Sequence, residues 1–187
     1  MQPPPPEALG FTYLISELLL TVTHRSRGEG VRQDRSTLRM LWVVILLSVT
    51  AGVYAAIAWP AAALPQRTLL RWIAVVLFVA GLGLRWWSIV ALGRFFTVDV
   101  QIANDHEVVE RGPFRGLRHP SYTGVLLAFL GFGLSLANWA ALLLLMVPIW
   151  IALLRRIRVE EEALTAALGE RYTSYMQRTK RLLPAIY

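Results

Sequence analysis

The stretch RHPSYTGVLLAFLGFGLSLANWAALLLLMVPIWIALL, residues 118–154, decides the fold of this chain. It begins with polar residues and continues as an apolar run whose main interruption is Ala137-Asn138. The run is longer than the about 20 residues that one helix needs to cross a bilayer, and its polar break favours a turn. We therefore expect two membrane helices joined as a hairpin.

Two further apolar windows, Leu41 to Trp59 and Leu69 to Leu92, have the length and the low charge that membrane helices need. Hydrophobic residues make up 56% of the 187 and charged residues 17%, which is too apolar for a soluble domain of this size. A shorter piece, Leu9 to Val22, covers only about 21 Å as a helix, against a hydrocarbon core of about 30 Å. It either spans the bilayer or lies in the interface, and both alternatives stay open.

The arginines are unevenly distributed along the chain. They gather in residues 25–39, in residues 94–118 and from residue 155 onward, whereas residues 60–68 and the hairpin turn contain almost none. Because positive charge is retained on the cytosolic side of membrane proteins, we expect these three regions and the C-terminus in the cytosol. This distribution accounts for the net charge of +7 without nucleic-acid binding. The N-terminus is then outside if the Leu9 segment spans.

We expect one domain over residues 1–187, with membrane helices in residues 1–92 and a polar loop, the hairpin and a further helix in residues 93–187. The fold class is all-α: a polytopic membrane helical bundle of about five transmembrane helices with a cytosolic amphipathic C-terminal helix. The loop Gly93 to Pro120 alternates apolar and polar residues, which favours a loop folded back against the helices. From Arg155 to Lys180 apolar side chains recur at helical spacing, and Gly169 weakens that helix.

The chain has no cysteine, which excludes disulfides, thiol catalysis and metal or haem sites built on Cys. The three histidines, His24, His106 and His119, are too scattered to suggest a metal site. The glycine pairs in residues 81–83 and 131–133 fall within apolar helices without a preceding strand. They indicate helix packing, so we expect neither a metal nor a Rossmann-type cofactor domain.

The polar start of the hairpin can carry chemistry. Pro120 is favoured at the first position of a helix, which makes His119 the cap. The backbone N–H groups of Ser121 and Tyr122 then lack partners within the helix. Such an end attracts an anionic ligand, helped by Arg118 and the positive end of the helix dipole. The alternative, favoured by spacing alone, is that Pro120 starts the span while Arg118 and Tyr122 anchor it at the headgroups.

Three charged positions stand out elsewhere. Arg156 and Glu160 are four apart and share one helix face, so an ordinary ion pair is the simplest account. Arg before Glu is the less favourable order, however, and the carboxylates of residues 160–162 repel one another, which points equally to function. Arg85 lies inside an apolar segment, about two turns from its end. An intramembrane Arg is a functional candidate, but snorkelling to the interface is the preferred interpretation.

Several motifs in the second half of the chain resemble those of the isoprenylcysteine carboxyl methyltransferase family, which are integral membrane enzymes with relatives that act on phospholipids. The motifs are Gly112-Pro113-Phe114, Arg118-His119-Pro120-Ser121-Tyr122-x-Gly124, Glu160-Glu161-x-x-Leu164, Leu168-Gly169, Tyr172-x-x-Tyr175 and Leu183-Pro184. They cover the chain from Gly93 onward, while the first half matches only as generic membrane segments.

The resemblance implies a cytosolic S-adenosylmethionine pocket between the loop, the hairpin helices and the C-terminal segment. The residues that it implies for cofactor binding are Gln101, His106, Glu107, Val108, Val109, Phe114, His119, Pro120, Ser121, Tyr122 and Glu160, with residues 106–109 as a strand-like segment around the cofactor. Phe114 stands where the family often has Tyr, so a hydroxyl contact is lost there. Arg156 and Glu160 are the implied catalytic residues, Arg156 fixing an acceptor carboxylate and Glu160 closing the pocket.

The implied function is S-adenosylmethionine-dependent methyl transfer to a lipid or lipid-linked acceptor, with a carboxylate favoured. A carboxylate needs little acid-base help, so positioning dominates, whereas a phospholipid amine would need a base such as Glu160. The alternatives are an NADPH-dependent sterol reductase-like enzyme, which carries a similar Arg-His-Pro-x-Tyr turn, and a non-enzymatic membrane scaffold. The expected partners are the bilayer and a lipophilic acceptor, with no obligate protein partner. The expected location is a bacterial inner membrane, with the active site facing the cytosol.

Overall fold

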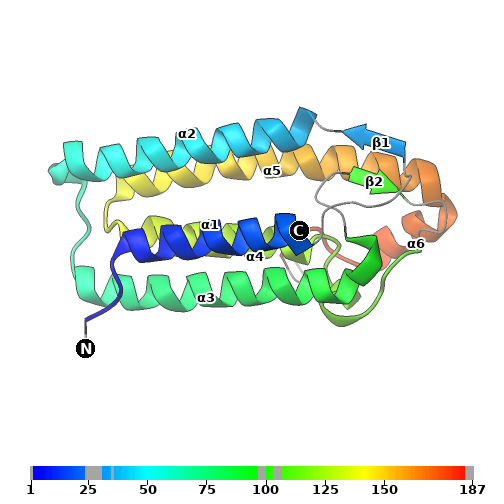
Figure 1. The fold of residues 1–187 in the computed structure, drawn as a ribbon, viewed down its shortest axis with the longest axis horizontal. Coiled ribbons are helices and arrows are strands. Elements are labelled where there is room, and N and C mark those ends of the chain that lie inside the picture. The colour runs from blue at the N-terminus through cyan, green and yellow to red at the C-terminus, as the bar shows by residue number, and fades with distance from the viewer. Residues whose placement is uncertain (1, 24–30, 35, 97–99, 103–106, 184–187) are drawn as a thin grey trace.

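A computed structural model describes residues 2–23, 31–34, 36–96, 100–102 and 107–183 of the chain. Five long helices run alongside one another in a single bundle, and consecutive helices alternate in direction (Figure 1). The elements in order are α1 (Pro6–Thr23), β1 (Val31–Asp34), α2 (Ser36–Ala58), the 3-10 turn η1 (Pro60–Ala62), α3 (Arg67–Leu92), η2 (Gly93–Phe95), β2 (Val100–Ile102), η3 (Gly112–Arg115), α4 (Pro120–Ser135), α5 (Trp139–Leu168) and α6 (Glu170–Arg178).

The bundle has two distinct ends. Figure 1 shows the N-terminal end of α1 and the α2–α3 connection at one end, and both strands and α6 at the other, which we call the polar end. Helix α3 packs most extensively against α4, and α2 against α5. The described strands form an antiparallel pair in which Arg32 lies opposite Gln101, and β2 also packs against α5. The expected all-α bundle is therefore confirmed, with a short strand pair added at the polar end.

Among the described helices, α2, α5 and the segment Arg67–Phe95 are long and apolar enough to cross a membrane. Helix α4 is shorter, with 16 residues, and its mostly buried surface lies inside the bundle. Helix α1 has 18 residues, so it is about 27 Å long, close to a hydrocarbon core of about 30 Å. Its outward side chains include Phe11, Leu18 and Val22, all more than half exposed. A lipid environment suits this face, which favours the spanning alternative for the Leu9 segment.

The hairpin break lies where the sequence predicts it. Helix α4 ends at Ser135, and Asn138 caps α5, its side-chain oxygen accepting a hydrogen bond from the Ala141 N–H at 3.0 Å. The Asn138 amide also donates to the Trp59 carbonyl at 3.0 Å, which ties the hairpin turn to the end of α2. Asn138 is only 2% exposed, so both of its hydrogen bonds are made inside the protein.

The expected amphipathic C-terminal helix is divided in two. Helix α5 continues past its apolar part to Leu168, and Gly169, at a φ of 55°, ends it before α6 begins at Glu170. A φ in the left-handed region carries no steric cost for glycine, so this residue sets the corner between the helices. The predicted helical segment therefore consists of two pieces, the α5 extension and the short α6.

Glycines bring α3 and α4 into close contact. A Cβ added to Gly81 would collide with the Ala128 backbone N and lie 2.6 Å from the Gly124 carbonyl, and a Cβ on Gly131 would lie 2.5 Å from an α3 carbonyl. Gly83 differs, because nothing lies within 4 Å of its missing Cβ. The packing role expected for residues 81–83 therefore holds for Gly81 and is wrong for Gly83. The close approach places the start of α4 against the α3 residues around Arg85.

Candidate active site

Helix α4 begins at the polar end as the sequence predicts, with Pro120 in its first turn and His119 as the cap. The Tyr122 and Thr123 N–H groups both donate to the His119 carbonyl, at 3.0 and 3.1 Å. The expectation that the Tyr122 N–H lacks a partner is therefore wrong. The His119 N–H donates to the carbonyl of Arg181 at 3.0 Å, so the segment after α6 covers this helix start.

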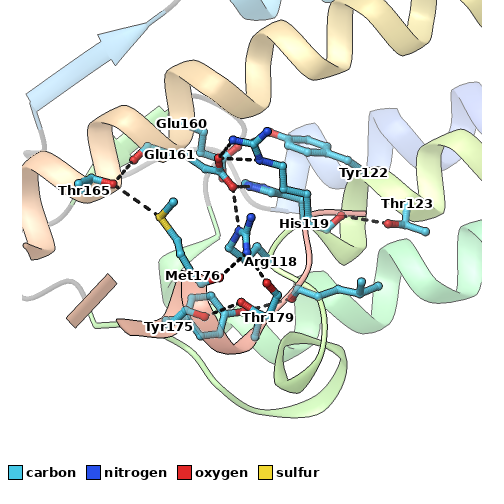
Figure 2. A network of polar contacts seen from close by, with 12 residues as sticks. Arg118, His119, Tyr122, Thr123, Glu160, Glu161, Thr165, Tyr175, Met176 and Thr179 are labelled. Carbon is cyan, nitrogen blue, oxygen red and sulfur yellow. Dashed lines mark hydrogen bonds and ion pairs between the residues drawn. The ribbon is translucent and has the colours of Figure 1, made fainter. Parts of the chain in front are cut away.

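Glu161 is the centre of a buried ionic cluster just beyond this helix start. Its carboxylate accepts from Arg118 at 2.9 Å and from Arg181 at 2.9 Å, and it lies 3.3 Å from His119 Nε2. Glu161 and His119 are each 4% exposed. Figure 2 shows the Arg118 and His119 side chains converging on the Glu161 carboxylate. Arg118 was expected to help bind a ligand anion, but a carboxylate of the protein itself takes that place.

Arg118 also ties α6 to the loop before α4. Its guanidinium donates to the Met176 carbonyl at 2.9 Å and to the Thr179 carbonyl (Figure 2). The buried Tyr175 hydroxyl donates to the Phe114 carbonyl at 2.7 Å. Burial raises the pKa of the Tyr175 phenol, so this hydroxyl stays protonated and able to donate. The segment from Phe114 to Arg118 is thus held in place by α6.

Tyr122 connects the two residues that were expected to form a simple ion pair. Its hydroxyl donates to the Glu160 carboxylate at 2.6 Å and accepts from Arg156 Nε at 2.9 Å. The Tyr122 ring stacks on the His119 ring, with 5.6 Å between centroids and 12° between planes. Arg156 is 4% exposed and its guanidinium also reaches the Thr37 hydroxyl of α2, at 3.4 Å. Arg156 and Glu160 therefore belong to a buried network rather than to an ordinary surface pair.

Arg85 does not snorkel. Its guanidinium makes a two-pronged ion pair with Glu17 of α1, at 2.6 and 2.7 Å, and donates to the Ser121 hydroxyl at 3.1 Å. The Arg85 and Glu17 side chains are 13% and 9% exposed. The snorkelling interpretation was wrong because the partner of Arg85 lies on another helix. The distance from Arg85 to the end of its own helix does not reveal that partner.

A polar cavity and an apolar groove lie next to each other between the helices. The cavity, about 630 Å³ including space open to the surroundings, is lined by residues from α1 to α5, among them Glu17, Arg85, Ser121, Tyr122 and Arg156. The groove, about 690 Å³ on the same measure, is lined almost entirely by apolar side chains. Three residues line both spaces, namely Tyr13, Trp42 and Ile45. The arrangement suits a molecule with a polar head and a long apolar chain.

The other predicted site residues within the described ranges lie at separate places around the polar end. Phe114 is buried under α6, and Pro120 is fully buried in the first turn of α4. Gln101 belongs to β2, while His106 lies outside the described residues. Glu107 to Val109 have no regular secondary structure, so the short strand of this loop is at residues 100–102 rather than 106–109.

Two important side chains were missed by sequence reasoning. Glu17 is the single charged residue in the Leu9 to Val22 segment, and a lone carboxylate in a membrane segment is itself a functional signal. Glu161 belongs to one of the family motifs, but its role could not be predicted because its neighbours Arg118, His119 and Arg181 are distant from it in sequence. Among the described residues no cluster of His, Asp and Glu is arranged to hold a metal ion.

Residues 69–171, more than half of the chain, match the family described as phospholipid methyltransferase. The chain is 29% identical over 139 residues to protein-S-isoprenylcysteine O-methyltransferase B of Arabidopsis thaliana, covering 64% of this chain and 71% of that protein. It is 25% identical over 174 residues to protein-S-isoprenylcysteine O-methyltransferase A of the same plant, covering 92% and 87%. An uncharacterized protein of Bacillus subtilis is 29% identical over 80 residues, covering 43% and 48%.

The fold also resembles a solved structure. The eukaryotic intramembrane Ras methyltransferase ICMT, an isoprenylcysteine carboxyl methyltransferase, superposes with a TM-score of 0.68 at 21% identity. The match covers 98% of this chain and 68% of that one. The two proteins therefore share the helical bundle.

Proposed function

Because this chain belongs to the phospholipid methyltransferase family, we propose that it is a membrane enzyme that transfers a methyl group from S-adenosylmethionine to a lipid-linked carboxylate. The observation that carries this proposal is the polar cavity, lined by two arginines, that adjoins an apolar groove. The groove suits the chain of a lipid-linked acceptor and the cavity suits its head. The plant relatives, which are named as O-methyltransferases of isoprenylcysteine, support a carboxylate acceptor.

The charge of the cavity separates a carboxylate from an amine acceptor. Its described lining contains two guanidinium groups, Arg85 and Arg156, and one carboxylate, Glu17. The formal charge of these three groups is +1, which attracts an anionic head and repels an ammonium group. Arginine also presents forked N–H donors that match a carboxylate. The lining therefore favours O-methylation over phospholipid N-methylation.

We assign the methyl donor to the region around Glu160, which lies about one helical turn after Arg156 on α5 and shares the Tyr122 hydroxyl with it. The half-buried Glu160 carboxylate accepts one hydrogen bond among the described residues, from Tyr122, so it retains capacity for the hydroxyl or ammonium donors of S-adenosylmethionine. The acceptor capacity of the Glu160 carboxylate fits the hydrogen-bond donors of the ligand. We assign Glu160, Tyr122 and the loop that carries Gln101 and residues 107–109 to its binding, with His119 holding the Tyr122 ring.

Positioning supplies most of the catalysis in this scheme. When bound, S-adenosylmethionine supplies an electrophilic methyl group, whose bond to sulfur breaks with its electron pair leaving on sulfur as a carboxylate oxygen forms the new bond. Arg156 orients the carboxylate, and the Tyr122 hydroxyl fixes Arg156 relative to Glu160. The buried setting of Arg156 excludes water from the acceptor. No residue has to remove a proton, since the acceptor arrives ionised.

We assign the polar end to the cytosol because the described parts of the arginine-rich segments lie there, among them β1, the loop before α4 and the α5 extension. The absence of cysteine allows a direct test with single cysteines introduced at exposed positions. In sealed bacterial cells, a membrane-impermeant maleimide should label Pro65→Cys at the α2–α3 connection. It should label Glu162→Cys, on the exposed side of the α5 extension, only after lysis. The reverse pattern would contradict the orientation.

The enzymatic proposal is tested with the purified protein in lipid nanodiscs. Calorimetry should detect binding of S-adenosylhomocysteine, and radiolabel from S-adenosylmethionine should appear in N-acetyl-S-farnesylcysteine but not in phosphatidylethanolamine. Glu160→Gln should weaken S-adenosylhomocysteine binding by about tenfold or more, as expected for loss of a charge-assisted hydrogen bond, while Glu162→Gln should not. Absence of binding, or a thermal shift with NADPH instead, refutes the methyltransferase. Label in the phospholipid alone refutes the carboxylate acceptor.

A further inference from the structure

Glu17 and Arg85 form a buried ion pair between α1 and α3 in the wall of the polar cavity. The carboxylate accepts from Arg85 Nε at 2.6 Å and from a terminal nitrogen at 2.7 Å, so it occupies two donors of the guanidinium fork. The third donor group reaches Ser121, the residue before Tyr122, at 3.1 Å. A carboxylate in this position is therefore adjacent to the residues assigned to the reaction.

The packing of α1 does not require this pair. The buried face of α1 consists of Leu9, Tyr13, Ser16, Glu17 and Leu20, and Ser16 already accepts a hydrogen bond from Trp86 at 2.8 Å. The two charges lose their hydration when they are buried. Well-packed apolar side chains in place of a buried ion pair often stabilise a protein equally well or better. Ionisable groups in membrane helices therefore point to function, and this pair lines a cavity.

The pair also lies where the groove joins the cavity. Tyr13, one helical turn before Glu17, lines both spaces. An acceptor whose chain fills the groove would therefore present its head near Arg85. The two-pronged contact of Glu17 has the geometry that an acceptor carboxylate would adopt on the same guanidinium.

We propose that Arg85 is a specificity-determining residue that binds the acceptor carboxylate, and that Glu17 occupies this site until the acceptor displaces it. The inference rests on the carboxylate acceptor proposed above. The exchange never leaves Arg85 buried without a counter-ion. With the acceptor bound, two guanidinium groups face two carboxylates, so the formal charge of the cavity is balanced. Because Glu17 competes with the acid for one cation, it lowers the affinity of the cavity for the acid.

Binding without the methyl donor tests the exchange. The probes are N-acetyl-S-farnesylcysteine, which carries the carboxylate, and its methyl ester, which does not, each titrated into the protein in nanodiscs. Glu17→Gln removes the competitor, so the acid should bind about five- to tenfold more tightly. Arg85→Gln removes the cation, so the acid should bind about tenfold or more weakly. Affinity for the ester and for S-adenosylhomocysteine should change less than about twofold in both variants.

Opposite effects of the two variants on the acid distinguish exchange from a structural clamp. If the pair only holds α1 in place, both variants weaken the acid and the ester together, and the inference is overturned. Arg85→Gln leaves Glu17 buried without its partner, so the double variant Glu17→Gln/Arg85→Gln guards against misfolding. It should bind the ester like the wild type and the acid weakly; equal loss of both overturns the inference. If the wild type binds S-adenosylhomocysteine but neither acid nor ester, the acceptor assignment and this inference both fail while the methyltransferase assignment stands.

Discussion

Replacing Glu161 with Gln should lower the free energy of unfolding by about 3 kcal/mol. The carboxylate is 2.9 Å from Arg118 Nε and 2.7 Å from a terminal nitrogen of Arg181, and the Arg118 side chain is only 10% exposed. Removing one partner of a buried ion pair costs about 3 to 5 kcal/mol because the other charge stays buried. The amide keeps one oxygen for Arg118, and Arg181 is 29% exposed, so the low end applies. This loss is a large part of the about 5 to 15 kcal/mol that stabilises a typical domain.

Reversible unfolding in mixed micelles, followed by tryptophan fluorescence, measures this change. The matched control is Glu162→Gln, the next residue on the same helix, whose side chain is exposed. The control should change stability by less than about 0.5 kcal/mol, as surface substitutions usually do. A loss below about 1 kcal/mol for Glu161→Gln would show that the ionic cluster around Glu161 does not stabilise the polar end.

Four other substitutions address packing, the site and the hairpin. Gly81→Ala should force α3 and α4 apart and cost about 1 to 3 kcal/mol, whereas Gly83→Ala, which meets open space, should be neutral or stabilising in the same thermal unfolding measurement. Tyr122→Phe should lower kcat by about tenfold or more, because Arg156 and Glu160 lose their shared hydroxyl, and an unchanged kcat would remove Tyr122 from the mechanism. Asn138→Ala should cost about 1 to 2 kcal/mol through loss of the α5 cap, and an unchanged melting temperature would contradict this.

Features that depend on local sequence could be predicted. The hairpin turn follows from a polar break in an apolar run, and the start of α4 follows from the preference of Pro120 for the first turn. The corner at Gly169 was indicated, but not that the helix ends there, because a glycine in a helical pattern is compatible with either outcome. Length and periodicity thus place the helices to within a few residues.

Features that depend on partners distant in sequence could not be predicted. Arg118 and Glu161 are 43 residues apart, and Arg85 and Glu17 are 68 residues apart. The charge of Arg118 therefore looked available to a ligand, and Arg85 looked like an interface anchor. β1 was missed for the same reason, because residues 31–34 gain their hydrogen bonds from residues 100–102, in a later loop.

The covering of the α4 start by the segment after α6 has a consequence for how the protein is made. The Arg118 and His119 N–H groups donate to the Lys180 and Arg181 carbonyls, and the Thr123 hydroxyl donates to the Leu182 carbonyl. A ribosome adds about 5 to 20 residues per second, so these partners are synthesised roughly 3 to 12 s after the helix start that they complete. During that interval the start of α4 lacks these hydrogen-bond acceptors. The start of α4 therefore gains its described hydrogen bonds only after synthesis has passed residue 182.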